Sequence, residues 1–452
     1  MIKNRENLLQ ISNHKTKELR RVMLDILENA LHSINISKIL SKSLIFDKIP
    51  DFGDYNNIYV LGFGKASGHM AEQIESILGI NNITDGIVIV PKNIIQTINL
   101  KKIKILEADH PIPSGTNIEA STKFLKMVEK IRNQNNLVIL LISGGGSALL
   151  TLPYEDINLK DISYLTELLL KSGADIKEIN IIRKHYDKFK GGKLAKQLYP
   201  AHIVSFLISD VGKYPPDIIA SGPTYPCKSR FHDVMQILEK YNLVETIPKS
   251  ILEHIKKGIN GEIPENPKEN DPCFINTRNI IIGSIKTVCK AVSDYANKQN
   301  ITPFIYPQFI EGEAKYIGKK IIDFANEIYI TAPKHVKPLL FIAGGETTVT
   351  IKGSGKGGRC QELLLGAMKN LEIFNQAIMI AIGTDGIDGN SDAAGAIIDN
   401  NSFSIAHNMG LNFEKFLQHN DSYTFFKELG HNLIFTGPTG TNVSDLVLLL
   451  LN

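Results

Sequence analysis

Residues that could do chemistry gather in glycine-rich loops, and the densest run is GGETTVTIKGSGKGGRCQE at residues 344–362 of this 452-residue chain. Its central side chain is Arg359, because a guanidinium offers a planar fork of donors that fits a carboxylate or a phosphoryl group better than an ammonium does. Glu346 stands at a predicted strand end in the same run. The Walker A pattern G-x-x-x-x-G-K-[ST] is not met, so Lys356 is predicted to be a solvated neighbour.

A second loop, LGFGKASG at residues 61–68, leads from a predicted strand into a predicted helix. Backbone N–H groups at such a helix start attract anions, and Lys65 adds a full charge beside them. We therefore expect Gly64 and Lys65 to bind phosphate, although a tight turn with a solvated lysine would look the same. The loop also resembles a dinucleotide fingerprint, but an NAD site needs an acidic side chain where this chain has Pro91 and Lys92.

A third loop, ISGGGSALL at residues 142–150, follows a strongly apolar predicted strand. Consecutive glycines allow a close backbone approach and positive φ angles, which a phosphate cradle needs. A nucleophilic Ser147 is the rival interpretation, but Leu149 occupies the final glycine position of the G-x-S-x-G elbow. A purely structural turn also remains open. The expected phosphate-binding residues are Ser143, Gly144, Gly145, Gly146 and Ser147.

A basic run, RKHYDKFKGGKLA at residues 183–195, surrounds a further glycine pair. Lys190 and Lys193 flank that pair and are predicted to touch phosphate. A charge run is also typical of a solvated helix face, and that interpretation stays open.

Strand-end aspartates are the candidate metal ligands. Asp210 and Asp385 each follow a predicted strand, and carboxylate oxygens are ligands that Mg²⁺ prefers. Asp385 could instead accept the proton of an attacking hydroxyl. Asp388 and Asp392 lie in the same glycine-punctuated loop, where aspartates commonly form turns, and the structural role is favoured for both.

The elements that must position these loops alternate as strand and helix. Helical spacing of apolar residues such as Met70, Ile74 and Ile77 separates the strand patterns, and an amphipathic helix containing Met23 and Ile34 comes before them. This rhythm predicts a doubly wound, mostly parallel sheet covered on both faces, with its ligand site at the carboxyl ends of the strands. The predicted strands are residues 58–61, 86–90, 103–107, 137–142 and 203–208.

The rhythm restarts after KKGINGEIPENPKENDP at residues 256–272, a stretch rich in Pro, Gly, Asn and charge. We therefore predict an N-terminal α/β domain over 1–255, a connecting loop over 256–272, and a C-terminal mixed α/β domain over 273–452, with the active site in the cleft. The second domain is predicted to contain strands at 280–282, 301–306, 338–343, 347–352 and 378–382, helices at 284–298 and 311–328, and a helix start within 437–446.

Composition narrows the class of protein. The formal charge is only +3, with Lys and Arg spread along the chain, which argues against nucleic-acid binding and leaves small anionic ligands. The four cysteines lie far apart, so neither a zinc site nor a disulfide framework is indicated. Apolar runs are too short to span a bilayer, and a cytoplasmic protein is expected. A monomer and a homodimer both remain open.

The chemical blocks occur in an order that resembles a known family. They are GFGKAS, ADHPIPSGTN, SGGGSALL, RKH…KGGKLA, SDV…ASGPT, GGETTV…GGRCQE, TDGIDGNSDAAGA and TGPTGTNVSDL. From about residue 15 to the C-terminus, the chain resembles the type II glycerate kinases, which carry a MOFRL domain. The resemblance implies phosphorylation of D-glycerate at its 2-hydroxyl by ATP, with Mg²⁺, to give 2-phosphoglycerate and ADP.

Residue roles also follow from the resemblance. It implies that Lys65 and Arg359 bind and orient the substrate and the transferred phosphoryl group. It implies metal or proton handling for Asp210, Glu346 and Asp385. Among these residues we assign Lys65, Arg359 and Asp385 to catalysis, Glu346 to substrate binding, and Asp210 and Asp385 to the metal.

Some positions depart from the family pattern. Lys213 and Tyr214 stand where carboxylates are expected, Cys360 replaces the asparagine of GGRNQE, and Ser444 replaces the second asparagine of GTNVND. These departures leave open a kinase for another small hydroxy acid, or a binding protein without turnover. Because some family members are labelled hydroxypyruvate reductases, an NAD(P)H-dependent reductase is kept as an alternative.

Overall fold

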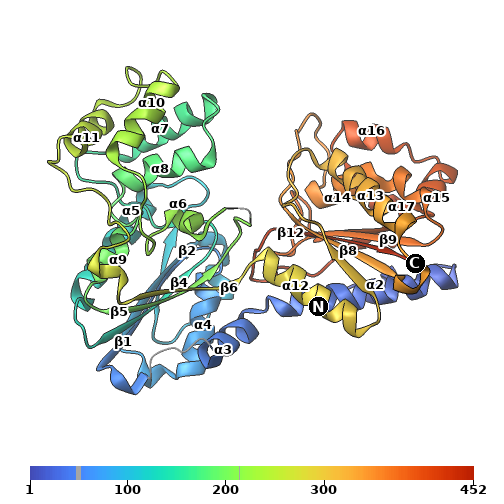
Figure 1. The fold of residues 1–452 in the computed structure, drawn as a ribbon, viewed down its shortest axis with the longest axis horizontal. Coiled ribbons are helices and arrows are strands. Elements are labelled where there is room, and N and C mark those ends of the chain that lie inside the picture. Colours follow the sequence, from blue (N-terminus) through green and yellow to red (C-terminus); the bar gives the residue numbers. More distant parts are fainter. Residues whose placement is uncertain (47–51, 213) are drawn as a thin grey trace. The chain divides into compact units, whose positions relative to one another are not determined.

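The computed structural model describes residues 1–46, 52–212 and 214–452, and the chain divides into two compact units (Figure 1). Met1–Lys38 together with Gly283–Asn452 form one unit, called here the terminal unit, and Ile39–Ile282 form the central unit. Each unit has its own sheet with helices, so the predicted α/β class is confirmed. Lys213 lies outside the described residues.

The central unit is built on a six-stranded sheet in the order β3-β2-β1-β4-β5-β6. Its pairs β3–β2, β2–β1, β1–β4 and β4–β5 are parallel, as the alternation of strand and helix predicted. Every residue of β4 is buried, because a strand in a sheet covered on both faces has no solvent side. The strands are β1 (Asn57–Phe63), β2 (Asp85–Pro91), β3 (Lys104–Ala108), β4 (Asn136–Ile142), β5 (His202–Ile208) and β6 (Thr277–Gly283).

Helices cover both faces of this sheet. Gly68 of α4 lies so close to the sheet that a Cβ would be 3.2 Å from the Val90 side chain. Ile89, whose side chain points to the opposite face, shares a buried core with Phe124 of α5 and Leu194 of α9. The helices are α3 (Ile36–Phe46), which spans the unit boundary, α4 (Ser67–Leu78), α5 (Gly115–Ile131), α6 (Gly146–Leu149) and α9 (Lys193–Leu198), with η1 (Phe52–Asp54), η2 (Ile80–Asn82), η3 (Lys92–Thr97), η4 (Pro216–Ser221) and η5 (Pro272–Phe274).

Four more helices of the central unit pack around a core of their own, and Figure 1 shows them gathered in one group. Leu165, Ile182, Val234 and Ile251 contribute one fully buried side chain from each helix. These helices are α7 (Leu159–Lys171), α8 (Ile176–Tyr186), α10 (Phe231–Lys240) and α11 (Lys249–Ile259).

The terminal unit has a mixed sheet in the order β11-β10-β9-β12-β8-β7, as predicted for the C-terminal domain. Only the pair β7–β8 is parallel among the pairs of this sheet. The central strand β12 is the apolar run LVLLLL with one aspartate before it. The strands are β7 (Thr302–Ile305), β8 (Leu339–Gly345), β9 (Ala377–Gly383), β10 (Gly395–Asp399), β11 (Leu433–Ile434) and β12 (Asp445–Leu451).

Helices also lie on both faces of the terminal sheet (Figure 1). On one face, Ile321 of α13 and Leu363 of α14 share a core with Phe341 of β8. On the other face, Gly344 approaches α12 so closely that a Cβ would be 2.1 Å from the Ile285 side chain. The helices are α1 (Arg5–Leu8), α2 (His14–Ser33), α12 (Ile285–Lys298), α13 (Ala314–Thr331), α14 (Arg359–Ala367), α15 (Ser402–Asn408), α16 (Phe413–Gln418) and α17 (Ser422–Leu429), with η6 (Lys334–Val336) and η7 (Met368–Ile373).

The amphipathic helix predicted near the N-terminus is α2, but it packs with the C-terminal half of the chain. Arg20 of α2 makes a buried ion pair with Asp399 at 2.7 Å and donates to the His431 carbonyl at 2.7 Å. Asn4 donates to the Leu433 carbonyl at 2.8 Å. The first residues therefore belong to the terminal unit, in contrast to the predicted domain over 1–255.

The predicted connecting loop, residues 256–272, lies inside the central unit. Asn266 is buried there, accepts a hydrogen bond from Lys193 at 2.7 Å and donates to the Lys184 carbonyl at 3.0 Å. Proline, glycine and charge in this stretch thus belong to a segment folded against α8 and α9. The chain passes between the units at residues 38–39 and 282–283 instead.

Two secondary-structure elements predicted for the terminal unit do not form in the part of the chain that the structure describes. The stretch 347–352 forms no strand and makes a single bridge between Thr348 and Glu313, although its β-branched residues suit a strand. The closing loop 437–446 leads into β12 and begins no helix. Across the described ranges, no helix has the length and apolarity needed to cross a membrane.

Candidate active site

The first two glycine loops of the central unit lie side by side, because they follow the adjacent parallel strands β1 and β4. The Lys65 N–H donates to the Gly144 carbonyl at 2.9 Å, and the Ala66 N–H donates to Ser143 Oγ at 2.9 Å. Gly64 has φ +126°, and a Cβ there would be 2.3 Å from Ser143 Oγ. Gly64 and Ser143 therefore brace the two loops against each other, and only glycine fits the first position.

Three charged or titratable side chains converge on this pair of loops. A Cβ on Gly145, whose φ is +81°, would be 3.0 Å from the His110 ring and 3.3 Å from Cγ of Lys65. A Cβ on Gly144 would be 1.9 Å from an Asp210 carboxylate oxygen. Burial and then the nearby Lys65 charge lower the pKa of His110, which favours the neutral imidazole. The sequence prediction included Lys65 and Asp210 but missed His110, whose only signal was its place in the ADHPIPSGTN block.

A pocket of about 610 Å³ begins at Gly145 and Ser147 and continues along α7 and α8. Lys190, which is predicted to touch phosphate, is among the residues that line it. The Lys190 ammonium is buried, however, and donates to an Asp187 carboxylate oxygen at 2.5 Å and to the Leu150 carbonyl at 3.0 Å. Burial lowers the pKa of Lys190. Its charge is therefore already balanced by Asp187.

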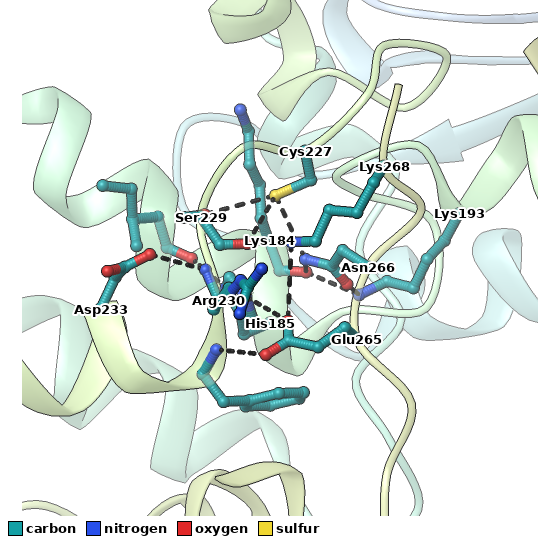
Figure 2. A network of polar contacts seen from close by, with 12 residues as sticks. Lys184, His185, Lys193, Cys227, Ser229, Arg230, Asp233, Glu265, Asn266 and Lys268 are labelled. Carbon is teal, nitrogen blue, oxygen red and sulfur yellow. Dashed lines mark hydrogen bonds and ion pairs between the residues drawn. The ribbon is translucent and has the colours of Figure 1, made fainter. Parts of the chain in front are cut away.

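Lys193, the other predicted phosphate-binding lysine of the basic run, belongs to a buried polar network. Figure 2 shows its ammonium directed toward Asn266, to which it donates at 2.7 Å, and it also donates to the Lys184 carbonyl at 2.6 Å. Burial lowers the pKa of Lys193 to about 8. These contacts hold the segment 256–272 in place, so a phosphate-binding role for Lys193 stays a prediction.

The terminal unit places Arg359 in a frame of carboxylates at the start of α14. Its Nε donates to Asp445 Oδ2 at 2.6 Å, and its Nη2 donates to Asp445 Oδ1 at 3.0 Å. Its Nη1 is paired with Glu346 Oε1 at 2.7 Å. The predicted neighbours Arg359 and Glu346 are thus brought together, and the bidentate pair with Asp445 fixes the plane of the guanidinium.

Asp445 is a site residue that the sequence prediction missed. It starts β12 and pairs in register with Gly345 of β8 and Gly383 of β9. Burial raises the pKa of Asp445 to about 7, and the guanidinium of Arg359 opposes that rise. The available signal was a lone acidic residue directly before the otherwise apolar run of a central strand.

Asp385 lies at the end of β9, beside Asp445. A Cβ on Gly383 would be 3.1 Å from Asp385 Oδ1 and 3.7 Å from Asp445 Oδ1. Asp385 Oδ1 accepts from the Ile387 N–H at 3.2 Å, and its Oδ2 accepts from Asn442 at 3.3 Å. These long hydrogen bonds leave capacity on both carboxylate oxygens for a ligand.

The other residues of these loops have structural contacts. Asp388 is buried and caps α14, accepting from the backbone N–H groups of Cys360 at 3.0 Å and Gln361 at 2.8 Å. The geometry therefore shows the structural role that the sequence favoured for Asp388. Cys360 points into the hydrophobic core, which accommodates a thiol in place of the usual asparagine. Lys356 is half-exposed and paired with Asp392 at 2.9 Å.

The available oxygen ligands restrict how this chain could hold magnesium. No group of three or more His, Cys, Asp or Glu side chains in the described parts of the chain is arranged to hold a metal ion. Asp210 and Asp385, the two predicted ligands, belong to different units. Mg²⁺ usually needs only one or two carboxylates when substrate phosphates supply other ligands. Asp385 fits that kind of site and does not fit an all-protein cage.

The chain is similar to known proteins over most of its length. Two family models match the chain: "Domain of unknown function (DUF4147)" over residues 22–256, and the MOFRL family over residues 339–445. A glycerate 2-kinase of Pyrococcus horikoshii is 41% identical over 399 residues, which cover 88% of this chain and 88% of that protein. A D-glycerate 2-kinase of Thermotoga maritima is 35% identical over 432 residues, covering 96% of this chain and 98% of that one.

A solved structure also matches over nearly the whole chain. The crystal structure of a glycerate kinase from Thermotoga maritima has a TM-score of 0.86 at 33% sequence identity, covering 96% of this chain and 100% of that chain. The fold, the glycine loops and these relatives define the chain as a phosphotransferase enzyme. It belongs to the glycerate 2-kinase family, the family that the order of its sequence blocks indicated.

Proposed function

We propose that this protein transfers the terminal phosphoryl group of ATP to the 2-hydroxyl of D-glycerate, giving 2-phosphoglycerate and ADP. The observation that carries the proposal is Arg359, held by Asp445 and Glu346 in a chain whose relatives at 35–41% identity are named glycerate 2-kinases. Phosphoryl transfer demands positioning and charge neutralisation more than covalent chemistry, and a fixed guanidinium supplies both.

Arg359 would bind the anionic part of the acceptor or the transferred phosphoryl group. Asp445 is 4% exposed and grips one side of the guanidinium, whereas Glu346 is 48% exposed and meets Nη1. The half-exposed partner is the one that a ligand can replace without leaving a charge buried. A carboxylate or phosphoryl oxygen would therefore take the place of Glu346 at Nη1.

Lys65 would neutralise the phosphates of the donor. It is exposed, and among the described residues no carboxylate lies within ion-pair distance of its ammonium. Its aliphatic chain lies against Gly145, beside the loop whose glycines leave the backbone open to an approaching anion. An uncompensated lysine next to such a loop favours an anionic ligand.

Asp385 would accept the proton of the 2-hydroxyl and bind the metal ion. Its carboxylate at the end of β9 is suited to accept the proton of the 2-hydroxyl as that oxygen attacks phosphorus. Magnesium bound with the nucleotide would neutralise charge on the phosphates, and Asp385 is the residue that would hold it in the terminal unit.

An ADP-release assay with ATP, Mg²⁺ and D-glycerate tests the proposal, with mass spectrometry and ³¹P NMR to distinguish 2-phosphoglycerate from 3-phosphoglycerate. We expect ADP release that requires D-glycerate and falls sharply in Arg359→Ala. Lys356→Ala is the matched control, because it removes a cation from the same loop. Oxidation of NADPH by hydroxypyruvate, without ADP release from ATP, would establish the reductase instead. A panel of small hydroxy acids would show whether another acceptor is preferred.

A further inference from the structure

The pocket of about 610 Å³ in the central unit has no role in the proposed handling of D-glycerate. Its walls are the loop from His110 to Pro113, the turn from Gly145 to Thr151, and the helices α7 and α8. Its volume lies within the range of roughly 300–1,000 Å³ typical of sites that enclose larger organic ligands. A three-carbon acid would leave most of this space unfilled.

One wall of the pocket is an apolar stripe. Ile162, Thr166 and Leu170 line it from α7 and are spaced four residues apart, so they lie along one face of that helix. Leu170 is 64% exposed, and Ile112 on the facing loop is 71% exposed. Large apolar side chains beside a hollow mark a surface that a ligand with an apolar face would cover.

The pocket also contains an uncompensated cation. Arg183, in the last turn of α8, lines it beside Lys190. Lys190 is neutralised by Asp187, but no carboxylate of the described residues lies within ion-pair distance of Arg183. Glu167 of α7 also lines the pocket, but its carboxylate is paired with Lys171 at 2.6 Å. An arginine in the same hollow without an acidic partner indicates an anionic ligand, and its fork of donors suits phosphate oxygens.

We propose that this pocket binds the purine nucleoside diphosphate part of the phosphate donor. The inference rests on the proposed kinase function, since the nucleotide is the substrate of that reaction with both a planar apolar base and phosphates. The base lies between the residues 111–113 and the α7 stripe, where the Ser163 hydroxyl offers a hydrogen bond to its edge. The Thr166 hydroxyl donates to the Ile162 carbonyl at 2.8 Å and can only accept from the base. Arg183 contacts the phosphates, which extend toward Gly145 and Ser147.

Calorimetric titration of the full chain with ADP, in the absence of glycerate, tests the site directly. Arg183→Gln should weaken ADP binding about 10-fold or more, as expected for loss of a charge-assisted hydrogen bond. Leu170→Glu should weaken it as well, because it puts a carboxylate beside the base and phosphates. Both variants should raise the KM for ATP while the KM for D-glycerate stays within about 2-fold.

Matched controls separate the pocket from general effects. Arg132→Gln removes an exposed arginine outside the pocket, and Tyr164→Glu places the same carboxylate on α7 away from it. Both should bind ADP like the parent chain, and thermal melting would verify that all four variants fold. Unchanged ADP binding in folded Arg183→Gln and Leu170→Glu, with kinase activity intact, would overturn the pocket assignment and leave the proposed function standing.

Two further outcomes would separate the pocket assignment from the kinase proposal. A rise in the KM for D-glycerate alone would overturn the assignment, because it would place the acceptor in the pocket. Loss of ADP binding in both pocket variants of a chain that phosphorylates no hydroxy acid would support the nucleotide site and refute the kinase proposal.

Discussion

The two cation-bearing glycine loops differ in how their charge is balanced. In the terminal unit, Arg359 is paired with Asp445 through two hydrogen bonds and with Glu346 through a third contact. In the central unit, Lys65 has an exposed ammonium with no ion-pair partner among the described residues. The first cation is oriented before any ligand arrives, whereas the second gains a partner only when an anion binds.

This difference assigns different work to the two residues. A guanidinium held in one plane can act on charge that develops in a transition state without reorganising. A flexible, uncompensated ammonium chiefly attracts and neutralises an anion, and its effect is screened by salt. Substitutions at the two positions should therefore separate orientation from charge.

The largest effect is expected for Arg359→Lys, which keeps the positive charge and removes the planar fork. We expect kcat/KM to fall by about 1,000-fold, comparable to the loss of a key transition-state donor. The free energy of unfolding should fall by about 1–3 kcal/mol, because buried Asp445 loses part of its hydrogen bonding. Steady-state kinetics and chemical denaturation measure both. Retention of more than a tenth of the activity would show that charge alone suffices at this position.

A smaller effect is expected for Lys65→Met, which removes charge but keeps a long side chain. We expect kcat/KM to fall by about 100-fold, since one electrostatic contact to phosphate is lost. Stability should change by no more than about 0.5 kcal/mol, because an exposed side chain without an ion pair contributes little. Activity should also lose part of its salt dependence relative to the parent chain. Strong destabilisation of Lys65→Met would contradict the view that this lysine is uncompensated.

The same comparison explains what could be predicted from sequence. Lys65 and Arg359 stand in local patterns, a strand end followed by glycines and a helix start, and local patterns can be recognised without the fold. Asp445 is 86 residues away from Arg359 in sequence, and only the pairing of β12 with β8 brings the two together. A long-range contact of this kind has no local signal.

The strand rhythm predicted β1 to β5 of the central sheet and β7, β8 and β9 of the terminal sheet, since apolar and β-branched runs reflect burial on a sheet. It assigned β6 to the second domain, although that strand belongs to the central sheet, and it did not predict β10, β11 or β12. The docking of α2 on the terminal unit depends on the buried pair of Arg20 with Asp399, 379 residues apart, and was therefore missed. Residues 347–352 have β-branched side chains but form a single bridge, because strand formation depends on available neighbours as well as propensity.

Asp445→Asn should have an intermediate effect, because it keeps the shape of the side chain and removes the charge that orients Arg359. We expect kcat to fall about 10-fold, matching the loss of a charge-assisted hydrogen bond. The pH profile gives a sharper test. Burial raises the pKa of Asp445 to about 7, so the parent chain should lose activity as the pH falls through that value and the carboxylate is protonated.

In Asp445→Asn the acidic limb of the pH profile, where activity falls as the pH falls, should flatten because the titrating group is absent. Glu346→Gln is the matched control, since it removes a half-exposed carboxylate from the other side of the same guanidinium and should keep the limb. A limb unchanged in Asp445→Asn would mean that a group other than Asp445 controls the pH dependence.

The smallest effect is expected for Lys356→Ala, which tests whether any lysine in a glycine loop would behave like Lys65. Lys356 is half-exposed, pairs with Asp392 at 2.9 Å and lies 3.9 Å from the centre of the Tyr423 ring. Because its charge is already balanced and no Walker A pattern surrounds it, kcat/KM should stay within about 2-fold of the parent value, as is usual for a surface substitution away from a site. Asp392→Ala removes the carboxylate partner of the same lysine and should also leave kcat/KM nearly unchanged. A loss in Lys356→Ala approaching that of Lys65→Met would mean that pairing with a carboxylate does not distinguish a structural lysine from a ligand-binding one.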